Sequence, residues 1–206
     1  MSQIKLLHSG GNGVILAAPD NNPASDRTLK LPGDADGTIA TTANAGKILQ
    51  VVSTTKTDSF SSSSTSYTDV TGFSATITPS SSSNKVYVMV HVNSSANIRY
   101  AAFRLVRGST NIAVGTDTTG AQEAVTFTTG TNNAITYDDL ILRNQSMAIN
   151  DSPSTTNATT YKLQGRVTYG TGTFYVNRIP YTDTTSTYVM RAASTITLYE
   201  VAAWVG

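Results

Sequence analysis

The chain contains no cysteine, which excludes disulfide bonds and every metal or redox site that depends on cysteine ligands. Charged residues are also scarce, at 13% of the sequence, about half of the usual share in soluble domains. The formal net charge is +1 and the charges are scattered, so the sequence has no basic stripe of the kind that binds nucleic acid. We therefore expect no nucleic-acid partner.

Long apolar runs are missing as well. No stretch approaches the ~20 apolar residues of a membrane span, and residues 1–10 lack the basic start and the apolar run of a secretion signal. We therefore expect no membrane insertion, and we expect synthesis in a cytoplasm without export by such a signal.

Hydroxyl side chains take the place of the missing charges. The sequence holds 23 Ser and 34 Thr, which is more than a quarter of its 206 residues. Thr favours strands, Ser, Asn and Gly favour turns, and the Lys, Glu and Leu typical of surface helices are few. This composition indicates an all-β protein with many strands joined by polar turns.

The chain divides near Ala45. Residues 1–45 are rich in Gly, Pro and Asn, with two short apolar pieces that each end at a proline, which cannot donate to a sheet ladder. So short a region cannot bury a core alone, yet it is too apolar for a solvated linker. We predict an extended arm that pairs with copies of itself or with another protein, with disorder as the alternative. The apolar residues assigned to attachment are Val14, Ile15, Leu16, Leu29, Leu31 and Ile39.

Residues 46–206 form a succession of strand patterns about ten residues apart, without a segment of helical periodicity. Such spacing predicts a β-sandwich, in particular a jelly roll. The predicted strands cover residues 47–52, 67–77, 85–92, 98–106, 112–114, 123–127, 135–142, 161–169, 173–179 and 195–201.

Two of these strands are apolar on both faces. In residues 85–92 the valines alternate with Tyr87, Met89 and His91, and residues 195–201 likewise lack a polar face. A lone sandwich normally has one dry and one wet face per strand. Self-association about a symmetry axis is the simplest cover for the outer face, and a loop or the arm is the alternative. We expect His91 to be a packed or interface residue.

Residues 28–42, TLKLPGDADGTIATT, resemble a segment common in phage tail fibres. Residues 46–52 look like the start of the globular tip domains of marine bacteriophage fibres, and residues 194–201 are similar to their closing strand. The resemblance implies a homotrimer in the virion tail, synthesised in the host cytoplasm. It also implies that the arm docks on the tail, the baseplate or an adaptor protein, and that a jelly-roll head over residues 46–206 binds a host-surface glycan or protein.

This chain departs from long fibres because it has neither coiled-coil heptads nor a long repeat shaft. A capsid decoration or head-fibre protein is therefore the alternative to a tail fibre. In that case the arm would grip the shell, and the head would still point outward.

Constellations for catalysis or metal binding are sparse. Two histidines are too few for a histidine-based metal cluster, and Asp34 and Asp36 lack the later ligands of a calcium loop. Asp138 and Asp139 lie in a strand pattern and so point to opposite faces. A glycan-degrading tailspike needs two positioned carboxylates. We therefore expect a protein that is not an enzyme and has no cofactor or metal, with such a tailspike as the minor alternative.

Tyrosine supplies the one signal of molecular recognition, with ten tyrosines against one tryptophan. Its rigid ring and polar tip suit sugar and protein surfaces, although half-buried strand tyrosines are an equally good interpretation. The candidate receptor-binding residues, all near predicted loops or strand ends, are Tyr137, Tyr175, Arg178, Tyr181 and Arg191.

Overall fold

The computed structural model describes residues 3–7, 13–17, 48–131, 141–187 and 189–203. The chain divides into two compact units, Met1–Ala45 and Gly46–Gly206. Among the described residues no helix is long and apolar enough to cross a membrane.

The N-terminal unit contains an antiparallel hairpin of β1 (Gln3–Leu7) and β2 (Gly13–Ala17). Three residues assigned to attachment lie in β2: Val14, Ile15 and Leu16. The other three lie outside the described residues: Leu29, Leu31 and Ile39.

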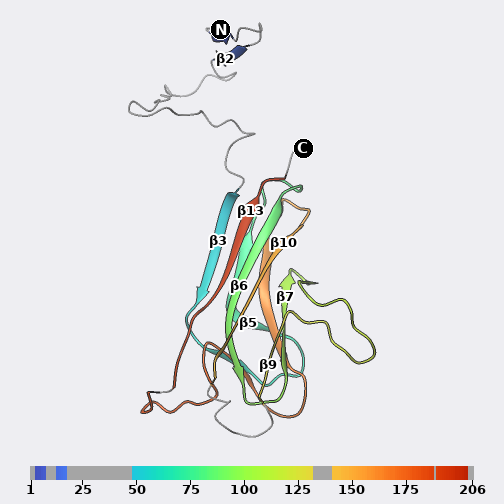
Figure 1. The fold of residues 1–206 in the computed structure, drawn as a ribbon, viewed down its shortest axis with the longest axis vertical. Coiled ribbons are helices and arrows are strands. Elements are labelled where there is room, and N and C mark those ends of the chain that lie inside the picture. The colour runs from blue at the N-terminus through green and yellow to red at the C-terminus, as the bar shows by residue number, and fades with distance from the viewer. Residues whose placement is uncertain (1–2, 8–12, 18–47, 132–140, 188, 204–206) are drawn as a thin grey trace. The chain divides into compact units, whose positions relative to one another are not determined.

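The second unit is a sandwich of two antiparallel sheets, which confirms the predicted all-β fold (Figure 1). The first sheet contains β3 (Ile48–Lys56), β4 (Phe60–Ser62), β6 (Lys85–Ala96), β10 (Arg143–Asp151), β12 (Phe174–Val176) and β13 (Ser194–Val201). The second sheet contains β5 (Thr68–Ile77), β7 (Ala101–Arg107), β8 (Thr110–Ile112), β9 (Phe127–Thr129) and β11 (Thr159–Val167). The chain passes repeatedly from one sheet to the other, as in a jelly-roll-like sandwich.

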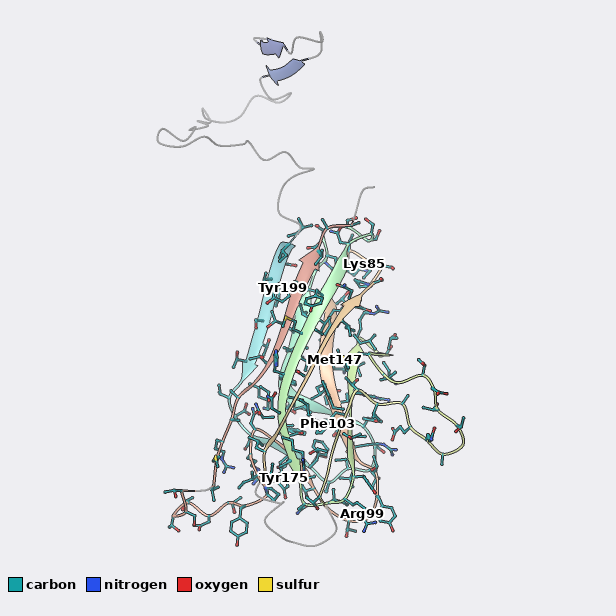
Figure 2. The ribbon with its side chains drawn as sticks, viewed as in Figure 1. Lys85, Arg99, Phe103, Met147, Tyr175 and Tyr199 are labelled. Carbon is teal, nitrogen blue, oxygen red and sulfur yellow. The ribbon has the colours of Figure 1, made fainter. Side chains whose placement is uncertain are left out.

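Strand β6 is the centre of the first sheet. One of its edges pairs with β13 and then with β12, and the other edge pairs with β10. Its twelve residues span roughly 40 Å at about 3.3 Å per residue. We call the end where β3 and β6 begin and β13 finishes the entry end, and the opposite end the far end. Lys85 and Tyr199 lie toward the entry end, and Arg99 and Tyr175 toward the far end (Figure 2).

The core lies between the two sheets. The four valines of β6 that alternate in the sequence are fully buried, as that alternation predicts: Val86, Val88, Val90 and Val92. Phe103 of β7 meets Phe174 of β12 edge-on, with ring centroids 5.1 Å apart. The two sheets are therefore held together by interdigitated aliphatic and aromatic side chains.

A buried polar group also joins the sheets. Arg107 of β7 donates to both carboxylate oxygens of Asp151 in β10, at 2.6 and 2.7 Å, and the Tyr161 hydroxyl of β11 donates to the same carboxylate at 2.7 Å. Burial, and then the bond to Asp151, raises the pKa of Tyr161. Both bonds from Arg107 come from the one nitrogen Nη1, and because hydrogen bonds between charged partners are stronger than neutral ones, this group holds β10 against the second sheet.

The sequence prediction missed two strands and ran past the ends of several others. β4 and β10 were not predicted, and residues 98–100, 113–114, 123–126, 168–169 and 177–179 are not part of a strand. Of the inward-facing positions of β10, only Met147 and Ile149 are apolar, whereas Gln145 and Asp151 are polar, so its pattern lacks the sustained hydrophobic period of a half-buried strand. Pairing with β6 along its whole length forms β10 instead. Most of the predicted strand 135–142 lies outside the described residues.

Gly165 allows a close approach of two aromatic rings in the core. A Cβ atom at this position of β11 would lie 2.7 Å from Cζ of Phe174 and 3.0 Å from Cδ1 of Phe103. Both rings are fully buried, so neither can move aside without disturbing the core.

We expect Gly165→Ala to lower the free energy of unfolding by about 1–3 kcal/mol, the usual cost of overpacking a core. Gly115→Ala is the matched control, because its added Cβ would meet nothing within 4 Å, and its effect should stay within about 0.5 kcal/mol. Urea unfolding followed by circular dichroism measures both. Equal effects of the two substitutions would contradict the packing described here.

Candidate functional site

Side chains from three strands form an apolar patch on the outer face of the first sheet, at the entry end. We call this patch the apolar face, and its residues are Ile48, Val51, Tyr87, Met89, Tyr199 and Val201. Most of them, together with Asn150 of β10, line a hollow of about 370 Å³. Ile48 is 57% exposed and Val51 is 54% exposed.

The register explains how these residues meet. Tyr199 of β13 lies opposite Val51 on one side and opposite Tyr87 on the other, where the two tyrosine rings are 6.2 Å apart. The predicted second apolar face of β6 and β13 is therefore present in the folded chain. Toward the far end the same face becomes polar, since Ser53 and Thr197 share a hydrogen bond of 2.8 Å.

His91 lies on the polar part of that face and is exposed. The expectation of a histidine packed within the chain is wrong, because side chains at alternate positions of β6 point outward and none of the described residues covers this one. Its role at an interface remains a prediction.

The outer face of the second sheet is different. Arg104 stacks over the Tyr67 ring at 3.9 Å, and the Tyr67 hydroxyl donates to Glu123 at 2.7 Å. Burial, and then the bond to Glu123, raises the pKa of Tyr67 to about 12. Lys162 donates to Asp69 at 2.8 Å on the same sheet. This face is polar and makes its bonds within the chain, so among the described residues the apolar outer surface belongs to the first sheet.

A buried carboxylate fixes the loops at the entry end. Glu200 is 2% exposed and accepts hydrogen bonds from the backbone and hydroxyl of Ser80, at 2.6 and 2.7 Å, and from the Asn84 amide at 2.6 Å. Burial alone would raise the pKa of Glu200, but the bonds from Ser80 and Asn84 outweigh it and hold the pKa below its usual 4.5. The ionised form is therefore the one that the fold stabilises.

Acid should remove this contribution. Because the folded-state pKa lies below the unfolded value, the stabilisation is present above about pH 4.5 and is lost as the pH falls through the folded-state value. We expect Glu200→Gln to cost about 1–3 kcal/mol at pH 7, since all three bonds are accepted by the charged oxygen Oε1 and a neutral amide oxygen accepts them more weakly, and to flatten the acid branch of a stability–pH profile. Asp117→Asn, at an exposed position, is the control. An acid branch as steep in Glu200→Gln as in the parent would be inconsistent with this role.

Three of the candidate receptor-binding residues come together at the far end. The Arg178 guanidinium lies 4.4 Å from the centre of the Tyr175 ring, and Arg178 pairs with Arg191 in a short antiparallel bridge. Tyr175 is only 7% exposed. Its ring therefore packs beneath the Arg178 guanidinium and is not itself available for contact with a receptor. Tyr181 is exposed in the connection that follows β12, and Tyr137 lies outside the described residues.

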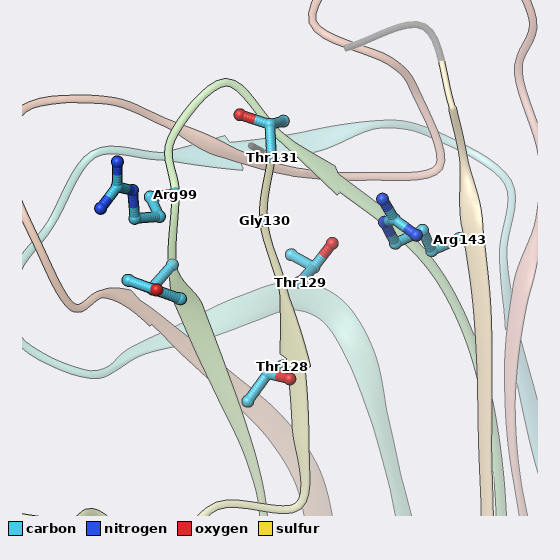
Figure 3. Close-up of a pocket in the computed structure, with 7 residues that line it drawn as sticks. Arg99, Thr128, Thr129, Gly130, Thr131 and Arg143 are labelled. Atoms are coloured by element: carbon cyan, nitrogen blue, oxygen red, sulfur yellow. The ribbon is translucent and has the colours of Figure 1, made fainter. Parts of the chain in front are cut away.

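A pocket that the sequence reasoning missed lies at the same end (Figure 3). It has a volume of about 550 Å³, and the residues that line it are Arg99, Tyr100, Thr128, Thr129, Gly130, Thr131 and Arg143. They come from the β6–β7 connection, from β9 and the residues after it, and from the start of β10. No local motif unites three such distant segments; only the arginines and the exposed Tyr100 at strand ends could have indicated it.

Close backbone packing shapes the pocket. A Cβ atom at Gly130 would lie 1.8 Å from the carbonyl oxygen of Arg99, so the position requires glycine. The Thr131 amide donates to the Ile98 carbonyl at 3.0 Å. Asn97, one residue earlier, accepts a bond of 2.7 Å from the Thr173 amide and donates to the Tyr175 hydroxyl. The connection that carries Arg99 is therefore held to the Tyr175–Arg178 edge.

Four carboxylates of the described sandwich already have bonding partners. Asp69 binds Lys162 and Gln164, Glu123 binds Arg166 and Tyr67, and Asp151 and Glu200 lie in the groups described above. Within residues 48–131 and 141–203, apart from 188, no three His, Asp or Glu side chains are placed to hold a metal ion.

Comparison with known proteins adds little to this description. No family model and no curated protein sequence matches the chain. Among solved structures, a chain of infectious bursal disease virus strain Gx aligns with a TM-score of 0.37 and 14% identity, over 98% of this chain and 51% of that one. The VP2 subviral particle of infectious bursal disease virus gives a TM-score of 0.33 and 15% identity, over 86% and 43%. This chain thus spans about half the length of the proteins it matches, and similarity at this level does not establish a relationship.

Proposed function

We propose that this protein is a non-enzymatic structural component of a virus particle, a short homotrimeric phage tail fibre that attaches by residues 1–45 and meets the host with the far end of its sandwich. The observation that carries the proposal is the apolar face. The assignment to the tail and the threefold symmetry rest on the resemblance of residues 28–42, 46–52 and 194–201 to phage fibres.

The apolar face is suited to contact with further copies of the chain. Ile48, Val51 and Tyr199 place adjoining apolar side chains on three neighbouring positions of β3 and β13, and contiguous exposed apolar surface marks an interaction site more often than scattered residues do. The second sheet makes its own polar contacts. Each sandwich therefore has one face to cover, as expected of protomers packed round an axis.

The small size of the N-terminal unit also favours its attachment to other chains over folding by itself. A two-stranded hairpin alone is at best marginally stable in water, and each ordered residue costs ~1–2 kcal/mol of backbone entropy. The β1–β2 hairpin has five residues in each strand. Pairing with other copies and with a virion protein would supply the stability that it lacks.

The trimer predicts a particle three times the 21.7 kDa of the chain. We expect Val51→Glu to yield a folded monomer, because it places a charge in the apolar face at a position that is already exposed. Thr55→Glu, on the same face of β3 but beside Thr195 in the polar part, should remain trimeric. Light scattering at micromolar concentration measures the mass, and a monomeric parent chain would refute the assembly.

Removal of residues 1–45 should leave a soluble, folded and trimeric head, because the strands of the sandwich begin at Ile48. We expect this head to compete with virions for host cells but not to be incorporated into particles. Circular dichroism, light scattering and an infection-competition assay follow these properties. If the head unfolds, the arm is part of the core; if it is still incorporated, attachment resides elsewhere.

A capsid decoration protein is the second candidate, and the same surfaces would serve it. Electron microscopy of virions labelled with an antibody to residues 46–206 separates the two. Label on the tail supports the fibre, whereas label distributed over the shell supports capsid decoration and overturns the tail assignment.

A further inference from the structure

We propose that the pocket between Arg99 and Arg143 binds an anionic saccharide. The inference deepens the proposed function, and it rests on that function in treating the ligand as part of the host surface. The chemistry of the pocket itself is independent of that role.

Charge is the first argument. Arg104, Arg107, Arg166 and Arg178 each bind a neighbour within the chain. By contrast, the guanidinium groups of Arg99 and Arg143 make no hydrogen bond or ion pair with any residue that the structure describes, and the described wall of their pocket holds no carboxylate. Arginine presents planar donors that match carboxylate and phosphate oxygens, so an anionic group complements this wall.

The remaining lining suits a sugar. Tyr100 is 56% exposed at the pocket, and an exposed aromatic ring offers rigid contact area beside polar groups. Thr128 and Thr131 add hydroxyl groups that both donate and accept. The Thr129 hydroxyl is buried in the wall and meets no hydrogen-bond partner among the described residues, which is uncommon for a buried polar group and is consistent with a polar ligand that completes the site.

The arrangement favours an extended ligand over a single small anion. Arg99 and Arg143 lie on either side of the segment Thr128–Thr131 (Figure 3). A volume of about 550 Å³ lies within the range of roughly 300–1,000 Å³ typical of ligand pockets. A saccharide that carries charges on separate units can meet both guanidinium groups.

The position of the pocket allows it to remain accessible in an assembled fibre. Arg99 lies at the far end of the sandwich, and Tyr199 of the apolar face lies toward the entry end (Figure 2). Protomers that associate through the apolar face would leave the far end free.

The test uses the full chain and three probes: trigalacturonate, its methyl ester, and a phosphorylated trisaccharide. The ester keeps the sugar rings and removes the charges. We expect calorimetry to show that trigalacturonate or the phosphorylated sugar binds at least about tenfold more tightly than the ester, and the tighter of the two identifies carboxylate or phosphate as the preferred anion. Binding should weaken as salt increases.

Substitutions then locate the site. Arg99→Gln and Arg143→Gln should each weaken binding about tenfold or more, as expected when one charge-assisted hydrogen bond is lost. Arg143→Lys, which keeps the charge, should retain more of the binding than Arg143→Gln. Arg191→Gln is the matched control, because it removes a far-end arginine that does not line the pocket. Circular dichroism checks that each variant is folded.

Any of three results would overturn the proposed saccharide site. The ester could bind as tightly as the anionic probes, neither anionic probe could bind, or Arg191→Gln could weaken binding as much as Arg99→Gln and Arg143→Gln do. A trimer that binds no saccharide contradicts the pocket and leaves the fibre assignment intact. A monomer that binds trigalacturonate through Arg99 and Arg143 supports the pocket and contradicts the assembly.

Discussion

The structure depends on the two-sided pairing of β6. This strand places four valines in the core and hydrogen-bonds along both edges, to β13 and β12 on one side and to β10 on the other. Because side chains alternate strictly along a strand, a shift of one residue would exchange its buried and outer faces. The packing of the valines between the sheets therefore also determines which side chains of β6 point outward into the apolar face. The proposed association surface is in this sense a consequence of the core.

The two outer faces of the sandwich show what the scarcity of charge means for this chain. On the second sheet, Tyr67, Arg104 and Glu123 form a network that makes its contacts within one protomer. On the first sheet, the entry end carries the aliphatic and aromatic side chains of the apolar face. In a chain with 13% charged residues, the charged and hydroxyl side chains are unevenly distributed over the two outer faces, and the apolar face at the entry end of the first sheet has few of them.

Periodicity revealed the parts of the fold that depend on apolar alternation. The valines of β6 and the residues Ile196 and Leu198 of β13 could be assigned to the core from their spacing, and they are fully buried. β10 could not be found in this way, because pairing with β6 and the bond from Arg107 to Asp151 define it more than hydrophobicity does. The pocket was missed for a related reason, since the sheets bring together residues from three segments that share no motif.

The grouping of Tyr175, Arg178 and Arg191 shows where composition reasoning succeeds and where it fails. A tyrosine and two arginines near strand ends do meet at the far end, yet the tyrosine is buried beneath the arginine it supports. The residue types indicated that aromatic and cationic groups lie at this end. The register of β12 and the hydrogen bonds of Asn97 decide which of these groups face outward. Seven residues of β6, roughly 23 Å at about 3.3 Å per residue, then separate Met89 of the apolar face from the end of the strand at Ala96. Burial of one end in an assembly is therefore compatible with recognition at the other.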